Sequence, residues 1–139
     1  EYDIQIELGD IANILAYISI GDRIQDIERL VGALADIKRL YAKNPEQMPN
    51  AEYIKPTVCV SPQTAFYGEK KSVPIRETEG MICSEFVMCY PPGIPILAPG
   101  EMITREIIDY IIYAKEKGCS MQGMQDPAVE SLFVLTGKY

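Results

Sequence analysis

The most regular pattern of hydrophobic positions begins after Asp22 and predicts a long helix. Asp22 followed by Gln25 has the form of a capping box, and apolar residues then recur at steps of three and four. These apolar residues are Ile24, Ile27, Leu30, Val31, Leu34, Ile37, Leu40 and Tyr41. We expect the helix to end near Asn44-Pro45, because proline restricts the residue before it and cannot continue the hydrogen-bond ladder.

Two further helices are predicted in the second half of the chain. Thr104 is placed to cap a helix over residues 105–117, whose inward positions are Ile107, Ile108, Ile111 and Ile112. Ser61-Pro62 followed by Gly68 has the pattern of an N-cap, a proline at the first helical position and a terminal glycine. One or two helical turns are therefore expected between Pro62 and Gly68.

Shorter runs predict strands. Residues 4–8 alternate between apolar and polar positions, which is typical of a half-buried strand, and residues 13–20 are apolar and predict a more deeply buried one. Further short strands are expected at residues 57–60, 71–77, 94–98 and 132–135. Pro74 indicates an edge strand or a bulge, and residues 81–90 fit either a strand or a short helix. The predicted fold is α+β, with mixed short strands packed with two main helices.

The domain organisation is predicted from length and from proline content. A chain of 139 residues, 47% of them hydrophobic, can form an ordinary core as a single α+β fragment. Residues 44–56 contain three prolines, so we place an internal boundary there, between residues 1–43 and residues 57–139. The chain opens without an initiator Met or a leader, so we expect a piece of a longer, cytoplasmic protein. The apolar stretches are shorter than the roughly 20 residues of a membrane span, so no membrane segment is predicted.

Charge and residue types exclude several classes of function. The formal charge of −7 comes from scattered acidic residues and argues against nucleic acid as a partner. The four cysteines form no CxxC pair and the chain has no His, so neither a metal site nor Ser-His-Asp or Cys-His catalysis is expected. Buried free thiols are the favoured interpretation of Cys59, Cys83, Cys89 and Cys119. Any chemistry here would use carboxylates, lysines or tyrosines.

The segment from Tyr90 to Glu101 is unusually rigid. Its twelve residues, Tyr-Pro-Pro-Gly-Ile-Pro-Ile-Leu-Ala-Pro-Gly-Glu, include four prolines and two glycines, which together limit the backbone and can hold a side chain in place. Glu101 lies three residues before Thr104, near the positive end of a helix dipole. The alternative is that Glu101 only answers this dipole and that the prolines build a tight turn.

The run from Tyr90 to Thr104 closely resembles a motif of the prokaryotic ornithine, lysine and arginine decarboxylases. Residues 61–67 (Ser-Pro-Gln-Thr-Ala-Phe-Tyr) and 80–86 (Gly-Met-Ile-Cys-Ser-Glu-Phe) match the same family in order and spacing. Together these segments cover about half of the chain. Residues 4–22 resemble, more weakly, the part of that family that joins its cofactor domain to its C-terminal domain.

The resemblance implies the small, C-terminal part of a fold-type-I enzyme that depends on pyridoxal phosphate. Such enzymes are dimers or assemblies of dimers, and they remove the α-carboxylate of a basic amino acid to give a polyamine precursor. The cofactor lysine belongs to an upstream segment outside this chain, so the resemblance implies no catalytic and no cofactor-binding residue here and a fragment that is inactive alone. Arginine, lysine and ornithine all stay open as the substrate.

For this chain the resemblance implies recognition of the substrate's distal cation by carboxylates. Glu101 is the first candidate by motif position. Glu85 is the second, because a lone carboxylate inside an apolar run is costly to bury; the alternative is a solvent-facing position. Tyr90 is a third candidate for the same cleft, with a core tyrosine as the alternative. Two other functions stay in competition: a free-standing module that binds a cationic metabolite, and a purely structural dimerisation domain.

Overall fold

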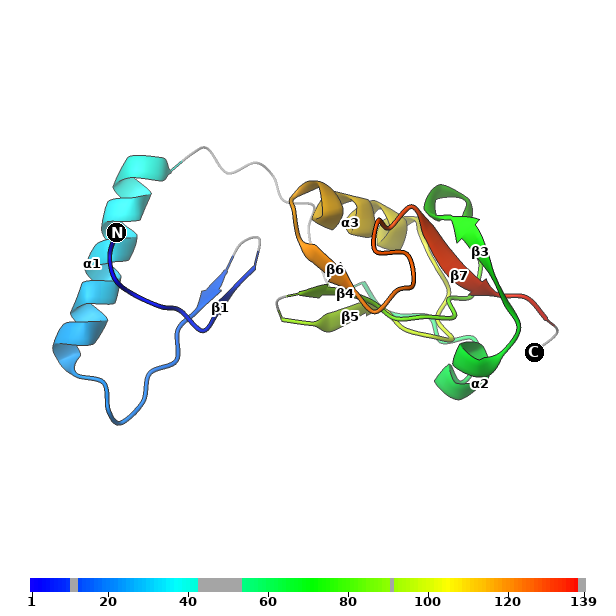
Figure 1. Cartoon of the computed structure of the whole chain (residues 1–139), viewed down its shortest axis with the longest axis horizontal. Coiled ribbons are helices and arrows are strands. Elements are labelled where there is room, and N and C mark those ends of the chain that lie inside the picture. The colour runs from blue at the N-terminus through cyan, green and yellow to red at the C-terminus, as the bar shows by residue number, and fades with distance from the viewer. Residues whose placement is uncertain (11–12, 43–53, 91, 138–139) are drawn as a thin grey trace. The chain divides into compact units, whose positions relative to one another are not determined.

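The computed structural model describes residues 1–10, 13–42, 54–90 and 92–137. The chain divides into two compact units, Glu1–Asn50 and Ala51–Tyr139, called unit 1 and unit 2 below (Figure 1). The boundary predicted at residues 44–56 lies mostly outside the described residues and stays a prediction. None of the described helices is long and apolar enough to cross a membrane.

Unit 1 contains one long helix, α1 (Ile24–Tyr41), which confirms the helix predicted from the apolar spacing. The predicted cap is wrong by one residue. Arg23 is the N-cap, and its backbone N–H donates to Oδ2 of Asp26 at 3.1 Å. Asp22 instead accepts the backbone N–H of Ser19 at 2.6 Å, because its carboxylate closes the turn that precedes the helix. The predicted end at Asn44-Pro45 lies outside the described residues.

The N-terminal strands of unit 1 are shorter than predicted. β1 (Leu8–Gly9) and β2 (Ile14–Leu15) form a two-residue antiparallel ladder. The period-two pattern of residues 4–8 is nevertheless visible in the burial, since Ile4 is half-buried while Gln5 is exposed. The strands stop early because this alternating segment has no further strand beside it among the described residues of unit 1.

Unit 2 contains most of the secondary structure. Its elements are α2 (Pro62–Tyr67), β3 (Lys70–Pro74), a 3₁₀ turn (Ile75–Glu77), β4 (Val87–Tyr90), β5 (Ile94–Leu97), α3 (Arg105–Glu116), β6 (Ser120–Gln122) and β7 (Ser131–Leu135). The α+β class is thereby confirmed. β6 was not predicted, and the strand predicted to reach residue 77 ends at Pro74, where the 3₁₀ turn begins. In residues 81–90, where the sequence left strand and short helix open, the structure has a strand, β4, at the end of the run.

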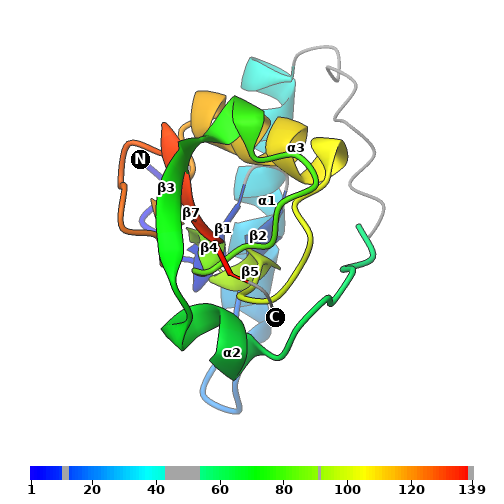
Figure 2. The same cartoon turned by 90° about the vertical axis from the view of Figure 1, so that its right-hand side faces the viewer.

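The named strands of unit 2 form two antiparallel sheets. Among the described residues β3 pairs with β7 and with no other strand, so the predicted edge position of Pro74 is confirmed. The second sheet has the order β5-β4-β6. α3 lies along one side of these strands (Figures 1 and 2).

α3 supplies a large part of the core of unit 2. Ile107, Ile108 and Ile111 are buried as predicted, and they join the cluster that also contains Leu97 and Leu132. Oγ1 of Thr104 accepts the backbone N–H of Ile107 at 3.3 Å, which confirms Thr104 as the cap. The cap of α2 is confirmed in the same way, because Oγ of Ser61 accepts the backbone N–H of Thr64 at 3.2 Å.

The turn before β7 is organised by a carboxylate that the sequence did not reveal. Asp126 accepts the backbone N–H groups of Ala128 (3.0 Å), Glu130 (2.9 Å) and Ser131 (3.0 Å). Val129, inside this turn, is buried and has a positive φ of 56°, which a β-branched residue rarely adopts. The Asp126 bonds therefore hold a turn that carries backbone strain.

The Asp126 turn makes the stability of unit 2 depend on pH. The backbone N–H donors of Ser131 and Glu130 lower the pKa of Asp126 below its ordinary value of 3.8. A lowered pKa stabilises the fold above pH 3.8, and this contribution is lost as the pH falls through the folded-state pKa. We expect Asp126→Asn to melt at a lower temperature than the wild type at pH 7, with the difference shrinking below pH 3.8.

Thermal melts of both proteins between pH 2 and pH 7 measure this, with the exposed Asp109→Asn as the control. A difference between wild type and Asp126→Asn that stays constant down to pH 2 would contradict the assignment.

Candidate functional site

Glu101 lies in the middle of an antiparallel ladder of three short stretches. On one side Val58 pairs with Glu101, and the backbone N–H of Cys59 donates to the carbonyl of Gly100 at 2.8 Å. On the other side the backbone N–H of Cys83 donates to the carbonyl of Glu101 at 2.9 Å. The backbone of Glu101 is therefore held from both sides.

The same ladder continues into the strands of unit 2. Cys83 pairs with Val134 of β7, and the backbone N–H of Ser84 donates to the carbonyl of Phe133 at 2.9 Å. β7 in turn pairs with β3. The end of the segment predicted to be rigid is thus attached to the β3–β7 sheet, which fixes the position of the Glu101 backbone.

Gly100 allows this close approach. Its φ is +92°, and a Cβ at this position would overlap the carbonyl oxygen of Val60. Only glycine combines the positive φ with the absence of a Cβ. The glycine directly before Glu101 therefore has a specific structural reason.

The side chain of Glu101 folds back over the preceding turn. It is half-buried, and its Oε2 accepts the backbone N–H of Ala98 at 2.8 Å, while the backbone N–H of Glu101 donates to the carbonyl of Ala98 at 3.2 Å. The carboxylate binds this turn, whereas α3 is capped by Thr104. Its contact is therefore with the turn rather than with the end of the helix. Contact of Glu101 with substrate stays a prediction.

Glu85 is buried and serves two backbone amides. Only 4% of its surface is exposed, so the solvent-facing alternative is wrong. Oε2 accepts the backbone N–H of Gln125 at 2.9 Å, and Oε1 accepts that of Phe133 at 2.8 Å. The carboxylate joins the loop before β7 to β7 itself. Contact of Glu85 with substrate stays a prediction.

Cys83 contacts the backbone of both Glu85 and Glu101. Its side chain is fully buried, and Sγ donates to the carbonyl of Glu85 at 3.1 Å. Burial raises the pKa of Cys83 to about 12, and the negative charges of Glu85 and Glu101 add to the rise. The thiol is therefore protonated and unreactive at neutral pH. Glu85 and Glu101 are thus both bound through their backbone carbonyls to the buried Cys83.

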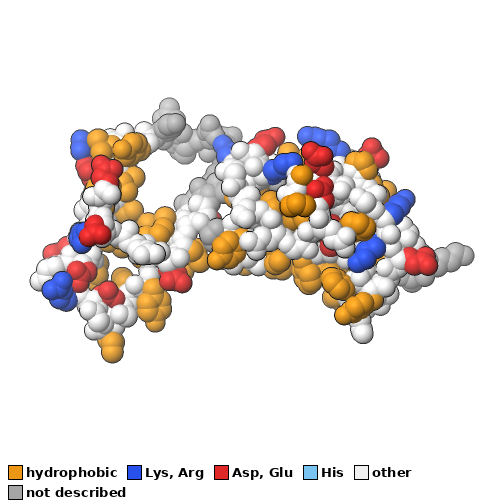
Figure 3. All heavy atoms as spheres, in the orientation of Figure 1, with side chains coloured by type: hydrophobic (Ala, Val, Ile, Leu, Met, Phe, Trp, Pro, Cys, Tyr) orange, Lys and Arg blue, Asp and Glu red, His pale blue; other side chains and the backbone are white. Residues whose placement is uncertain are grey.

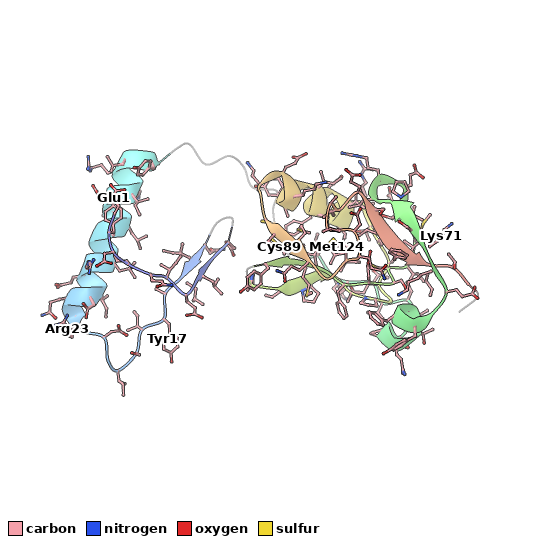
Figure 4. The ribbon with its side chains drawn as sticks, in the orientation of Figure 1. Glu1, Tyr17, Arg23, Lys71, Cys89 and Met124 are labelled. Carbon is pink, nitrogen blue, oxygen red and sulfur yellow. The ribbon has the colours of Figure 1, made fainter. Side chains whose placement is uncertain are left out.

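The four cysteines, all within the described ranges, form no disulfide, and their burial differs. Cys83 is buried, Cys89 and Cys119 are half-buried, and Cys59 is exposed. The expectation of buried thiols is therefore confirmed for Cys83 only. Figure 4 shows Cys89 on β4.

Tyr90 belongs to a different sheet from the ladder that contains Glu101. It is the last residue of β4, opposite Ser120 of β6, and it is 52% exposed, so the alternative of a core tyrosine is wrong. Glu85 and Glu101 instead belong to the ladder around Cys83. A role for Tyr90 in lining a substrate cleft stays a prediction.

Ser84 is a residue that the sequence reasoning did not single out. It is fully buried, and its hydroxyl donates to the carbonyl of Ala65 in α2, which ties this helix to the ladder. The signal was the polar pair Ser84-Glu85 inside an apolar run, because buried polar groups need partners. Only Glu85 was interpreted in this way.

The described lysines do not fit a cofactor that requires an enclosed amine. Lys38, Lys55, Lys71, Lys115 and Lys117 are exposed. Lys70 is half-buried, but its Nζ donates to the carbonyl of Phe66 at 3.0 Å and lies over the Phe66 ring. Within the described ranges, no three His, Cys, Asp or Glu side chains gather into a group that could hold a metal ion.

Comparisons with known proteins agree with this fold. The family model described as Orn/Lys/Arg decarboxylase, C-terminal domain, matches residues 39–128. The arginine decarboxylase of Halalkalibacterium halodurans is 39% identical over 137 residues, which cover 96% of this chain and 28% of that protein. The arginine decarboxylase of Bacillus subtilis is 37% identical over the same shares.

A solved structure shows the same fold. The lysine decarboxylase of Francisella novicida superposes with a TM-score of 0.67 at 22% identity, over 96% of this chain and 26% of that one. The chain therefore belongs to the Orn/Lys/Arg decarboxylase family, in which it contains the C-terminal domain. It spans 28% of the length of the arginine decarboxylases that it matches.

Proposed function

We propose that this chain is part of a decarboxylase of a basic amino acid, arginine, lysine or ornithine, that forms a polyamine precursor. The observation that supports it is the match of nearly the whole chain to two arginine decarboxylases at 39% and 37% identity. The complete protein would be a cytoplasmic homo-oligomer built from dimers. Its substrate is a small cationic amino acid.

The cofactor of this proposed enzyme is pyridoxal phosphate, which supplies the electron sink for loss of the α-carboxylate. The described lysines are exposed or, for Lys70, bound to a backbone carbonyl, so they do not fit the anchoring role. We therefore assign the cofactor to a part of the protein outside this chain. On this proposal the chain is inactive alone.

The contribution that we assign to this chain is recognition of the distal cation by Glu101. Its backbone is held by Val58 and Cys83, and its Oε2 is fixed by the backbone N–H of Ala98, so the carboxylate has little freedom left to lose. A half-buried carboxylate forms stronger charge-assisted hydrogen bonds than an exposed one. Oε1 is the oxygen that we assign to the guanidinium or ammonium group.

Glu101→Gln in the complete protein tests this assignment. Glutamine keeps an acceptor for Ala98 but removes the charge, so we expect the fold to persist and KM for the preferred substrate to rise by about 10- to 100-fold, as for the loss of a hydrogen bond to a charged group. Steady-state kinetics give KM and kcat separately.

Glu106→Gln is the matched control, since Glu106 is an exposed carboxylate in the first turn of α3. We expect it to leave KM unchanged. An unchanged KM in Glu101→Gln, with activity intact, would refute the role of Glu101 and favour a structural domain. It would leave the decarboxylase assignment standing.

A further inference from the structure

Unit 1 buries very little of its apolar surface. Among the described residues, fifteen of the sixteen buried hydrophobic side chains belong to unit 2, and Ala33 is the single one in unit 1. Unit 1 instead holds twelve of the eighteen large hydrophobic residues that are exposed. A soluble domain rarely leaves so much apolar surface uncovered unless it forms an interface.

The exposed residues form a continuous face on α1. Ile24, Ile27, Val31, Leu34 and Ile37, called the α1 face below, are exposed by 71%, 36%, 60%, 41% and 39%. At about 100° per residue these five positions share one sector of the helix, about 140° wide. Lys38 also lies within this sector, in the last turn of α1. Its long aliphatic stem lets the ammonium group extend beyond the apolar side chains. Figure 3 shows hydrophobic side chains along this helix.

The rest of unit 1 extends the uncovered surface. Tyr17 and Ile18, which follow β2, are 79% and 58% exposed, and the ring of Tyr17 points outward (Figure 4). A hollow of about 230 Å³ separates this segment from the start of α1 and is lined in part by Ile4, Ile18 and Ile27. The elements of unit 1 thus do not close a core of their own.

The comparisons indicate which part of the protein would cover this surface. The match to the arginine decarboxylases includes unit 1, because it covers 96% of the chain. The C-terminal domain model begins only at residue 39, near the end of α1. The α1 face therefore corresponds to a part of the relatives that precedes their C-terminal domain.

We propose that the α1 face is buried against the part of the same polypeptide that precedes the C-terminal domain, so that unit 1 completes a core begun elsewhere. The occupant is an apolar surface of that preceding part, and this inference rests on the chain being a piece of a longer protein. The expected consequence is that the α1 face is closed to solvent in the complete gene product and open in the 139-residue chain.

Cysteine accessibility tests the proposal. Val31→Cys places a thiol in the α1 face, and Gln25→Cys places one about 120° away on the exposed polar side of the same helix. Each variant is reacted with a maleimide in the complete gene product and in the 139-residue chain, and labelling is assigned by peptide mass spectrometry because the native Cys59 is also exposed.

We expect Val31→Cys to react about tenfold or more slowly in the complete product than in the chain, and Gln25→Cys to react equally in both. Equal reactivity of Val31→Cys in both proteins would overturn the proposal. Protection in the 139-residue chain that grows with its concentration would assign the face to a second copy instead. Protection in that chain at every concentration would assign it to unit 2. The assay measures no activity, so its outcome is independent of the proposed chemistry.

Discussion

Gly100→Ala should destabilise unit 2 by about 3–5 kcal/mol, because it combines backbone strain with a steric overlap. Gly100 has a φ of +92°, and its added Cβ would overlap the carbonyl oxygen of Val60. To relieve the overlap, the stretch that contains Val60 would have to move away from Glu101. Hydrogen exchange of the β3 and β7 amides reports the free energy of opening of unit 2 directly.

Gly80→Ala is the matched control for this substitution. Gly80 also has a positive φ, +77°, but a Cβ there meets no atom within 4 Å. It therefore measures the cost of the backbone conformation alone, about 1–2 kcal/mol. Equal losses in the two variants would show that the approach of Gly100 to Val60 is not tight, and the rigid mount of Glu101 would lose its main support.

Glu85→Ala should cost unit 2 about 3–4 kcal/mol, because it leaves two backbone N–H groups without their charged acceptor. The carboxylate is 4% exposed, and it receives the N–H groups of Gln125 and Phe133 on separate oxygens. Glu85→Gln retains one acceptor but turns an NH₂ group toward the other donor, so we expect about half of the loss. Urea unfolding of the three proteins measures the series.

Glu130→Ala is the control, because it also removes a glutamate carboxylate close to β7, but an exposed one. Glu130 is exposed and lies directly before β7, so we expect its replacement to change the stability by less than about 0.5 kcal/mol. If Glu85→Ala were as mild as Glu130→Ala, the two bonds of Glu85 would not hold the loop to β7. Glu85 would then be available for the substrate role predicted from the sequence.

The helices could be predicted from the sequence because their signals are local. The apolar spacing of α1, the Thr104 cap of α3 and the Ser61-Pro62 start of α2 each depend on residues within a few positions of one another. The cap of α1 was misplaced by one residue because Asp22 and Asp26 are both suitable acceptors, and Asp22 is used by the preceding turn. A local competition of this kind is not visible in spacing.

The candidate site could be predicted only in part because its contacts are long-range. The proline and glycine content predicted a rigid segment, but it could not show that Val58 and Cys83 would hold the backbone of Glu101 from its two sides. The cost of burying Glu85 correctly called for partners, yet these partners are backbone amides 40 and 48 residues away. Backbone donors carry no signal in the sequence, so a functional carboxylate and a structural one look alike there.

The central claim is that this chain contributes to a basic amino acid decarboxylase whose cofactor is held outside it. The direct measurement is release of carbon dioxide from arginine, lysine and ornithine, each with added pyridoxal phosphate, by the complete gene product and by the 139-residue chain. The account predicts release from at least one of these substrates by the complete product and none by the chain alone. Release by the chain alone, or a complete product inert toward all three, would contradict it.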